Sequence, residues 1–141
     1  MSRIYWDTLL FIYMIEGDPQ FGAKVRRISK RMRERGDTLC TSVFAFAEVL
    51  TGAVKGGEPE LARDLRSYFR SHELELLPFT ADMAERFAEI RGKNNLSEVD
   101  TIHLATAAHA GVDLFLTNDK RLHRLIIPGI SFIAGLDGTI F

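Results

Sequence analysis

Short apolar segments separated by helical ones constrain the fold of this chain most. The hydrophobic pattern predicts the element order β-α-α-β-α-α-β-α-α-β-α-β, with at least one helix between every two consecutive strands. Strands that are joined through helices run parallel within one sheet, because the helix returns the chain to the edge from which the strand started. The sequence therefore predicts an α/β fold with a parallel sheet.

The bounds of the expected elements follow from the hydrophobic period and from residues that start or stop helices and strands. Strands are expected at residues 3–7, 38–43, 74–77, 113–117 and 131–134. Helices are expected at residues 8–15, 20–35, 44–54, 60–71, 80–93, 97–110 and 122–127. Ser42 and Ser97 each precede an apolar helical segment, and each is expected to cap the helix that follows it.

Length and composition favour one globular domain that spans residues 1–141. The formal net charge of −1 argues against a protein that coats nucleic acid by bulk electrostatics, so any such contact must be local. Cys40 is the only cysteine, which excludes an internal disulfide and favours a reducing cytoplasm. Asp7 interrupts the apolar start of the chain, which disfavours a secretion signal, and no apolar run is long enough to span a membrane.

Acidic side chains recur where the predicted strands end and the next helices begin. Asp7 and Asp119 follow strands, Asp100 opens a helix, and Glu48 lies in an apolar helix that follows a strand. In a parallel sheet these positions share one edge. Carboxylates packed there repel one another unless a cation is present, and oxygen ligands suit Mg²⁺ or Mn²⁺. No Ser-His or Cys-His arrangement is evident, so water activated by such an ion is the expected nucleophile.

Each of these carboxylates also has a purely structural explanation. Asp7 and Asp119 are in positions to cap helices, and Asp100 has the spacing of a capping box with Ser97. Glu48 lies among apolar residues, which predicts burial and the need for a partner, and its structural explanation is a pair with an arginine. Capping alone does not require all of these carboxylates to share one edge of the sheet, which favours a common site.

Four segments of the sequence, taken together, are similar to a known family. They are IYWDT near the amino terminus, FAEVL, VDTIHLATAAHAG and LFLTNDKRL, and their spacing covers essentially the whole chain. The pattern resembles the PIN-domain ribonucleases, most closely the toxin subunits of VapBC-type toxin–antitoxin pairs. The resemblance implies a three-layer α/β/α domain around a central parallel sheet of four to five strands.

The resemblance also implies a function. It assigns catalytic and Mg²⁺- or Mn²⁺-binding roles to Asp7, Glu48, Asp100 and Asp119. It implies a metal-dependent endoribonuclease that hydrolyses RNA phosphodiester bonds by water attack and leaves a 5′-phosphate. It further implies a homodimer that is held inactive by a small cognate antitoxin, docked in an apolar groove near the first helices.

The residues around Asp119, the last acidic position, match the family pattern in part and depart from it in part. Thr117 and Asn118 match polar residues of the family and are expected to support the site through hydrogen bonds. Many members carry a further acidic residue soon afterwards, where this chain has Lys120 and Arg121, so a second metal ion is not implied. Lys120, Arg121 and Arg124 are instead candidates for weak contacts with RNA phosphates.

Two features stay open at this stage. His103, one turn after Asp100, either contacts the site or is a packed helix histidine. The helix over residues 20–35 either holds an RNA backbone or presents a solvated face, because its positive charges surround the helix rather than forming one stripe. These basic residues are Lys24, Arg26, Arg27, Lys30, Arg31, Arg33 and Arg35.

Other function classes explain the sequence less well. A phosphoacceptor domain also gathers acids around Mg²⁺, but it needs an acidic pair after the first strand, where Asp7 stands alone. A phosphatase with a D-x-D motif on the first strand is disfavoured because Leu9 replaces the second aspartate. A catalytically silent PIN-like domain that binds RNA or protein remains the alternative.

Overall fold

A computed structural model describes residues 1–137 and has one parallel sheet at its centre. The strands are β1 (Arg3–Trp6), β2 (Thr38–Ser42), β3 (Glu75–Leu77), β4 (Leu114–Leu116) and β5 (Phe132–Ala134). Their order in the sheet is β3-β2-β1-β4-β5, and every neighbouring pair is parallel. The prediction of a parallel sheet of four to five strands is confirmed, with β1 in the central position.

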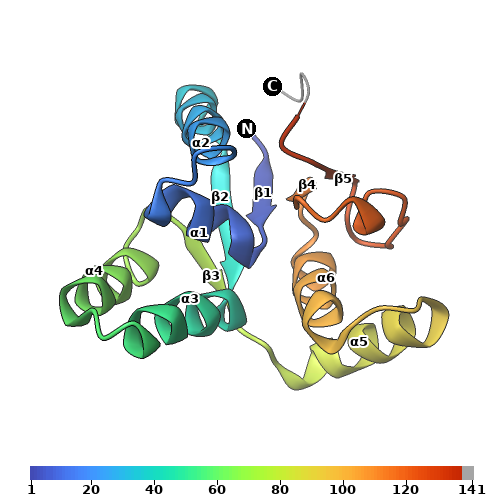
Figure 1. Cartoon of the computed structure of the whole chain (residues 1–141). Coiled ribbons are helices and arrows are strands. Elements are labelled where there is room, and N and C mark those ends of the chain that lie inside the picture. Colours follow the sequence, from blue (N-terminus) through green and yellow to red (C-terminus); the bar gives the residue numbers. More distant parts are fainter. Residues whose placement is uncertain (138–141) are drawn as a thin grey trace.

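Helices cover both faces of this sheet and complete three layers (Figure 1). They are α1 (Thr8–Glu16), α2 (Gly22–Arg35), α3 (Val43–Lys55), α4 (Pro59–Phe69), α5 (Ala81–Lys93) and α6 (Glu98–Ala110). One apolar core joins the sheet to α1, α2, α3 and α4, and a second joins it to α5 and α6. No helix within residues 1–137 has the length and apolar character needed to cross a membrane.

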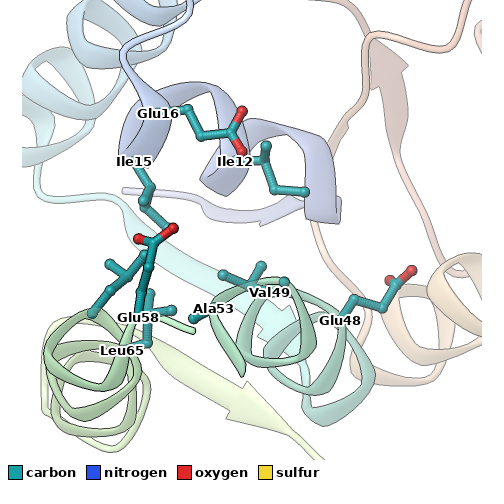
Figure 2. Close-up of a pocket in the computed structure, with 10 residues that line it drawn as sticks. Ile12, Ile15, Glu16, Glu48, Val49, Ala53, Glu58 and Leu65 are labelled. Carbon is teal, nitrogen blue, oxygen red and sulfur yellow. The ribbon is translucent and has the colours of Figure 1, made fainter. Parts of the chain in front are cut away.

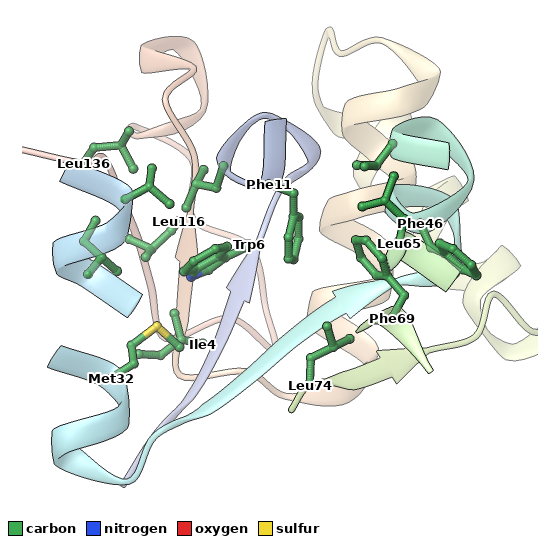
Figure 3. Packing of buried hydrophobic residues seen from close by; sticks show 14 of the residues in the cluster. Ile4, Trp6, Phe11, Met32, Phe46, Leu65, Phe69, Leu74, Leu116 and Leu136 are labelled. Atoms are coloured by element: carbon green, nitrogen blue, oxygen red, sulfur yellow. The ribbon is translucent and has the colours of Figure 1, made fainter. Parts of the chain in front are cut away.

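Alternation along the central strands divides their side chains between the two cores. Ile4 and Trp6 of β1 pack in the first core, together with Phe11 and Phe69 (Figure 3). Tyr5, which lies between them in the sequence, points to the other face and belongs to the second core. A strand that is buried on both faces needs apolar side chains at every position, which explains the unbroken apolar segments of the sequence.

The helices α3 and α6 begin at the serine caps that the sequence predicted. The Ser42 hydroxyl accepts a hydrogen bond from the backbone amide of Ala45 at 2.9 Å, and the Ser97 hydroxyl accepts one from the amide of Asp100 at 3.1 Å. Each bond satisfies one of the amides that the first helical turn leaves without a partner. These caps fix where α3 and α6 begin, and so where Glu48 and Asp100 lie.

The expected helix over residues 122–127 is wrong. The chain forms only a short 3-10 helix, η1 (Lys120–Leu122), and continues without a helix as far as Pro128. Ile127 precedes that proline, whose ring disfavours the helical conformation of the residue before it. Leu122 and Ile127 are buried all the same, so the apolar pattern of this segment reflects packing against the second core.

Candidate active site

Asp7 lies directly after β1, at the carboxyl edge of the sheet. Its Oδ1 accepts a hydrogen bond from the backbone amide of Leu9 at 3.1 Å, which makes Asp7 the N-cap of α1. Its Oδ2 accepts a hydrogen bond from the hydroxyl of Thr117. Burial raises the pKa of Asp7 above its ordinary value, and the Thr117 hydrogen bond is the strongest influence that lowers it.

Thr117 connects the ends of the two central strands. Its side chain is fully buried, and besides donating to Asp7 its hydroxyl accepts a hydrogen bond from the backbone amide of Asp119 at 3.1 Å. The sheet register explains the contact, because Trp6 pairs with Leu116 and the next residue of each strand is therefore adjacent. Thr117 therefore contacts both Asp7 and Asp119, whereas the amide of Asn118 donates to the Tyr13 hydroxyl at 3.1 Å.

A positive charge lies between Asp119 and Asp100. The Arg121 guanidinium Nη2 is 2.6 Å from Asp119 Oδ2 and 3.7 Å from Asp100 Oδ2. The hydrogen bond from Arg121 lowers the pKa of Asp119, although partial burial opposes this. Asp119 also accepts a hydrogen bond from the backbone amide of Arg121 at 3.0 Å and so caps η1.

Glu48 is held by α1 and α6. Its Oε1 accepts hydrogen bonds from the hydroxyl of Thr8 and from Nε2 of His103, the latter at 3.1 Å. Burial raises the pKa of Glu48, but these hydrogen bonds outweigh that effect and leave its pKa below the ordinary value. The expectation of a buried glutamate paired with an arginine is wrong: 31% of the side chain is exposed, and its partners are a threonine and a histidine.

These contacts form two networks at the carboxyl edge of the sheet. One runs from Asp7 through Thr117, Asp119 and Arg121 to Asp100, and the other joins Glu48 to Thr8 and His103. The backbone connects the two networks, because Thr8 directly follows Asp7 and His103 lies one turn after Asp100 on α6. We call these eight residues the ring. Thr8 is not among the residues predicted from the sequence, although its position directly after Asp7 indicated that it lies at the same edge of the sheet.

The donor chemistry of this ring fits a hard divalent cation. Its carboxylate oxygens are the ligands that Mg²⁺ and Mn²⁺ prefer, and the Arg121 guanidinium already supplies a cation to Asp119 and Asp100. Within residues 1–137, no three His, Cys, Asp or Glu side chains are already arranged to hold a metal ion. An ion bound by Asp119 and Asp100 would compete with the Arg121 guanidinium for the same carboxylate oxygens.

The other basic candidates lie outside the ring. Lys120, the first residue of η1, and Arg124, which follows it, are both exposed and close in sequence to Asp119. On α2, the core-facing side is formed by Val25, Ile28 and Met32, while most of the basic residues lie on the exposed remainder of the helix. Some of these charges are already paired within the chain, for example Arg31 with Glu34 at 3.3 Å.

A groove between α1, α3 and α4 adjoins the ring at Glu48. The cavity has a volume of about 230 Å³. Ile12 and Ile15 of α1 face Val49 and Leu65 across it (Figure 2). Three carboxylates line the groove together with this apolar floor, and they belong to Glu16, Glu48 and Glu58. The groove therefore combines an apolar floor with negative charge.

The PIN domain family model matches residues 4–127, which include all four predicted carboxylates. The chain belongs to the PIN-domain family. This assignment confirms the resemblance of the four sequence segments, and the three-layer fold agrees with it. No curated protein matches the sequence.

Solved structures that resemble this PIN domain include toxin–antitoxin complexes and a toxin. The DNA-bound VapBC complex of Salmonella typhimurium contains a chain with 25% identity and a TM-score of 0.74, covering 97% of this chain and 100% of that one. The promoter-bound VapBC2 complex of Rickettsia felis gives 19% identity and a TM-score of 0.76, covering 94% and 98%. VapC20 of Mycobacterium tuberculosis, a toxin that cleaves the sarcin-ricin loop, gives 17% identity and a TM-score of 0.66, covering 87% and 96%.

Proposed function

We propose that this PIN domain is an endoribonuclease dependent on Mg²⁺ or Mn²⁺ and that it is the toxin of a toxin–antitoxin pair. The observation that carries the proposal is the gathering of Asp7, Glu48, Asp100 and Asp119 at the carboxyl edge of the sheet, in two contact networks that the backbone joins through Thr8 and His103. The similarity to a VapBC complex and to the toxin VapC20, which cleaves the sarcin-ricin loop, supports RNA as the substrate.

In this proposal the four carboxylates hold the divalent ion. Such an ion activates water for attack on a phosphodiester and neutralises the negative charge that develops. The remaining residues of the ring orient the carboxylates: Thr117 donates to Asp7, and Thr8 and His103 donate to Glu48. Lys120 and Arg124 are exposed beside Asp119, where they are suited to contact RNA phosphates.

The test is cleavage of a mixed cellular RNA pool by the purified protein, with Mn²⁺ or Mg²⁺ compared with EDTA. Asp7→Asn and Asp100→Asn are each expected to lower the cleavage rate by about 100-fold or more, beyond the effect typical of residues that only support ligands. Asp64→Asn removes an exposed carboxylate on α4, far from the ring in sequence, and is the matched control. Intact RNA under every condition, with no divalent ion bound, would instead support the catalytically silent binding domain.

The groove between α1, α3 and α4 is the proposed docking site for the antitoxin. Its apolar floor and its three glutamates suit a segment that carries both apolar and basic side chains. We expect Glu16→Lys combined with Glu58→Lys to abolish co-purification with the co-expressed cognate antitoxin. Glu34→Lys combined with Glu89→Lys makes the same charge change at exposed positions of α2 and α5 and is expected to leave the complex intact. Equal loss in both variants would contradict the assignment of the groove.

We also propose that the protein is a homodimer, as the resemblance to VapBC toxins implies. Large apolar side chains that are exposed around α5 and α6, among them Phe79, Val99 and Ile126, support an interface there. Light scattering coupled to size-exclusion chromatography measures the mass directly. A monomer mass of 15.9 kDa at micromolar concentration would refute the dimer.

A further inference from the structure

His103 is buried where β1, α1 and α3 meet α6. Only 4% of the residue is exposed. Its Nδ1 is 2.7 Å from the Tyr5 hydroxyl of β1. Its Nε2 is 3.1 Å from Glu48 Oε1 of α3 and 3.2 Å from the Thr8 hydroxyl of α1. Both ring nitrogens therefore have partners, and one of those partners is a carboxylate of the site.

The chemistry of the partners determines which ring nitrogen carries the proton. A carboxylate only accepts hydrogen bonds, so Nε2 of His103 must donate to Glu48. A neutral imidazole carries one proton, so Nδ1 must accept, and the Tyr5 hydroxyl supplies the hydrogen. Burial raises the pKa of Tyr5, which keeps this hydroxyl protonated. The chain of donors runs from Tyr5 through His103 to Glu48.

Both donors to Glu48 converge on a single oxygen. The Thr8 hydroxyl and His103 Nε2 each donate to Oε1. Among residues 1–137, no group donates a hydrogen bond to Oε2. A carboxylate held in this way offers its second oxygen to a ligand, and the two fixed donors restrict rotation of the side chain.

Aromatic packing holds the donor chain rigidly. The Tyr5 ring stacks on Phe115 with a centroid distance of 5.0 Å and an interplanar angle of 6°. His103 meets Phe44 edge to face at 5.9 Å, and Tyr5 in the same way at 5.9 Å. The Tyr5 side chain is fully buried in the second core. The orientation of His103, and through it that of Glu48, is therefore set by the folded core.

We propose that Tyr5 and His103 are positioning residues that fix Glu48 with Oε1 occupied and present Oε2 to the divalent cation. This inference rests on the proposed metal-dependent function, because it assigns Glu48 to the ion. A buried histidine with satisfied hydrogen bonds but no functional role is the opposing explanation. The two differ in what removal of a single donor does to metal affinity in a protein that stays folded.

The first measurement is the Mn²⁺ dissociation constant, taken by electron paramagnetic resonance without RNA. His103→Leu removes the donor and is expected to weaken binding about 10-fold or more, as loss of an outer partner of a metal ligand does. Tyr5→Phe is expected to weaken binding in the same direction. His103→Gln is expected to restore affinity relative to His103→Leu, because its side-chain amide can donate to the same oxygen. His109→Gln, at an exposed position of α6, is the control and is expected to leave affinity unchanged.

The second measurement is the ¹⁵N NMR spectrum of the His103 ring, which needs no metal. Protonation at Nε2 in the unmodified protein is the expected result, and protonation at Nδ1 would overturn the proposal. Circular dichroism melts identify any variant that is unfolded. If the unmodified protein binds Mn²⁺ and His103→Leu binds it equally well, the positioning role fails while the proposed function stands. If the unmodified protein binds no Mn²⁺ and leaves RNA intact, the proposed function fails and the positioning role fails with it.

Discussion

Replacing Thr117 by valine tests whether the ends of β1 and β4 are joined by one hydroxyl. Valine keeps the shape of the side chain but removes the donor to Asp7 and the acceptor of the Asp119 amide. The Thr117 side chain is fully buried, so water cannot readily replace either hydrogen bond. We expect a loss of stability that depends on the charge of Asp7.

The magnitude follows from the type of hydrogen bond that is lost. A hydrogen bond to a charged group contributes about 1.5–3 kcal/mol, so Thr117→Val is expected to lower the free energy of unfolding by about this amount near pH 8. Loss of the donor also raises the pKa of Asp7 further, because the Thr117 hydrogen bond is the strongest influence that lowers it. A raised pKa means that the folded state holds its proton more tightly than the unfolded state does, so stability falls as the pH rises through that pKa.

The assay is urea unfolding of both proteins at pH 8 and pH 5, in EDTA. The unfolded pKa of Asp7 is common to both proteins and cancels from the comparison, so the stability gap is expected to shrink as the pH falls and Asp7 becomes neutral in the variant. Thr106→Val is the matched control, because Thr106 is equally buried but its hydroxyl only donates to the carbonyl of Ile102. A gap that is identical at both pH values, or equal to that of the control, would refute the reasoning.

Two further predictions concern Arg121 and the loop after Pro128. Arg121→Ala removes the positive charge that Asp119 and Asp100 share, so Mn²⁺ is expected to bind the variant more tightly in calorimetric titrations. Weaker binding would mean that Arg121 supports the ion instead of competing with it. Gly129→Ala is expected to lower the free energy of unfolding by more than about 1 kcal/mol in urea titrations, because φ of Gly129 is +101° and a Cβ would collide with the carbonyl oxygen of Ala108. The control is Gly92→Ala, whose Cβ meets nothing within 4 Å. Equal effects of the two substitutions would contradict this account.

The arrangement of the sheet could be predicted because it depends on local signals. Helices between consecutive strands require parallel pairing, and parallel pairing places the carboxyl ends of the strands on one edge. Serine caps then fix the helix starts, as Ser42 and Ser97 do. The expected helix over residues 122–127 failed for a related reason: a buried apolar period does not distinguish a helix from an irregular packed segment, and the influence of Pro128 was given too little weight.

The partners of the carboxylates could not be predicted, because they are separated widely in sequence. Glu48 contacts Thr8, which is 40 positions away in the sequence, and His103, which is 55 positions away. No local sequence pattern predicts either contact. The sequence indicated that Glu48 needed a partner, since an unpaired charge among apolar residues is costly, and an arginine was the obvious choice. A histidine takes that place here, and the Tyr5 hydroxyl on its far side is the partner of its other ring nitrogen.

Capping and site formation turn out to be compatible roles for one carboxylate. Asp7 caps α1 through Oδ1 and takes the Thr117 hydrogen bond on Oδ2, and Asp119 caps η1 while it pairs with Arg121. Both roles demand the same place, because a helix that follows a parallel strand begins at the carboxyl edge where sites are built. The position of an acid after a strand therefore cannot distinguish a cap from a ligand. The distinguishing feature is a side chain that two acids share, as Arg121 is shared by Asp119 and Asp100, because a cap needs only its own helix.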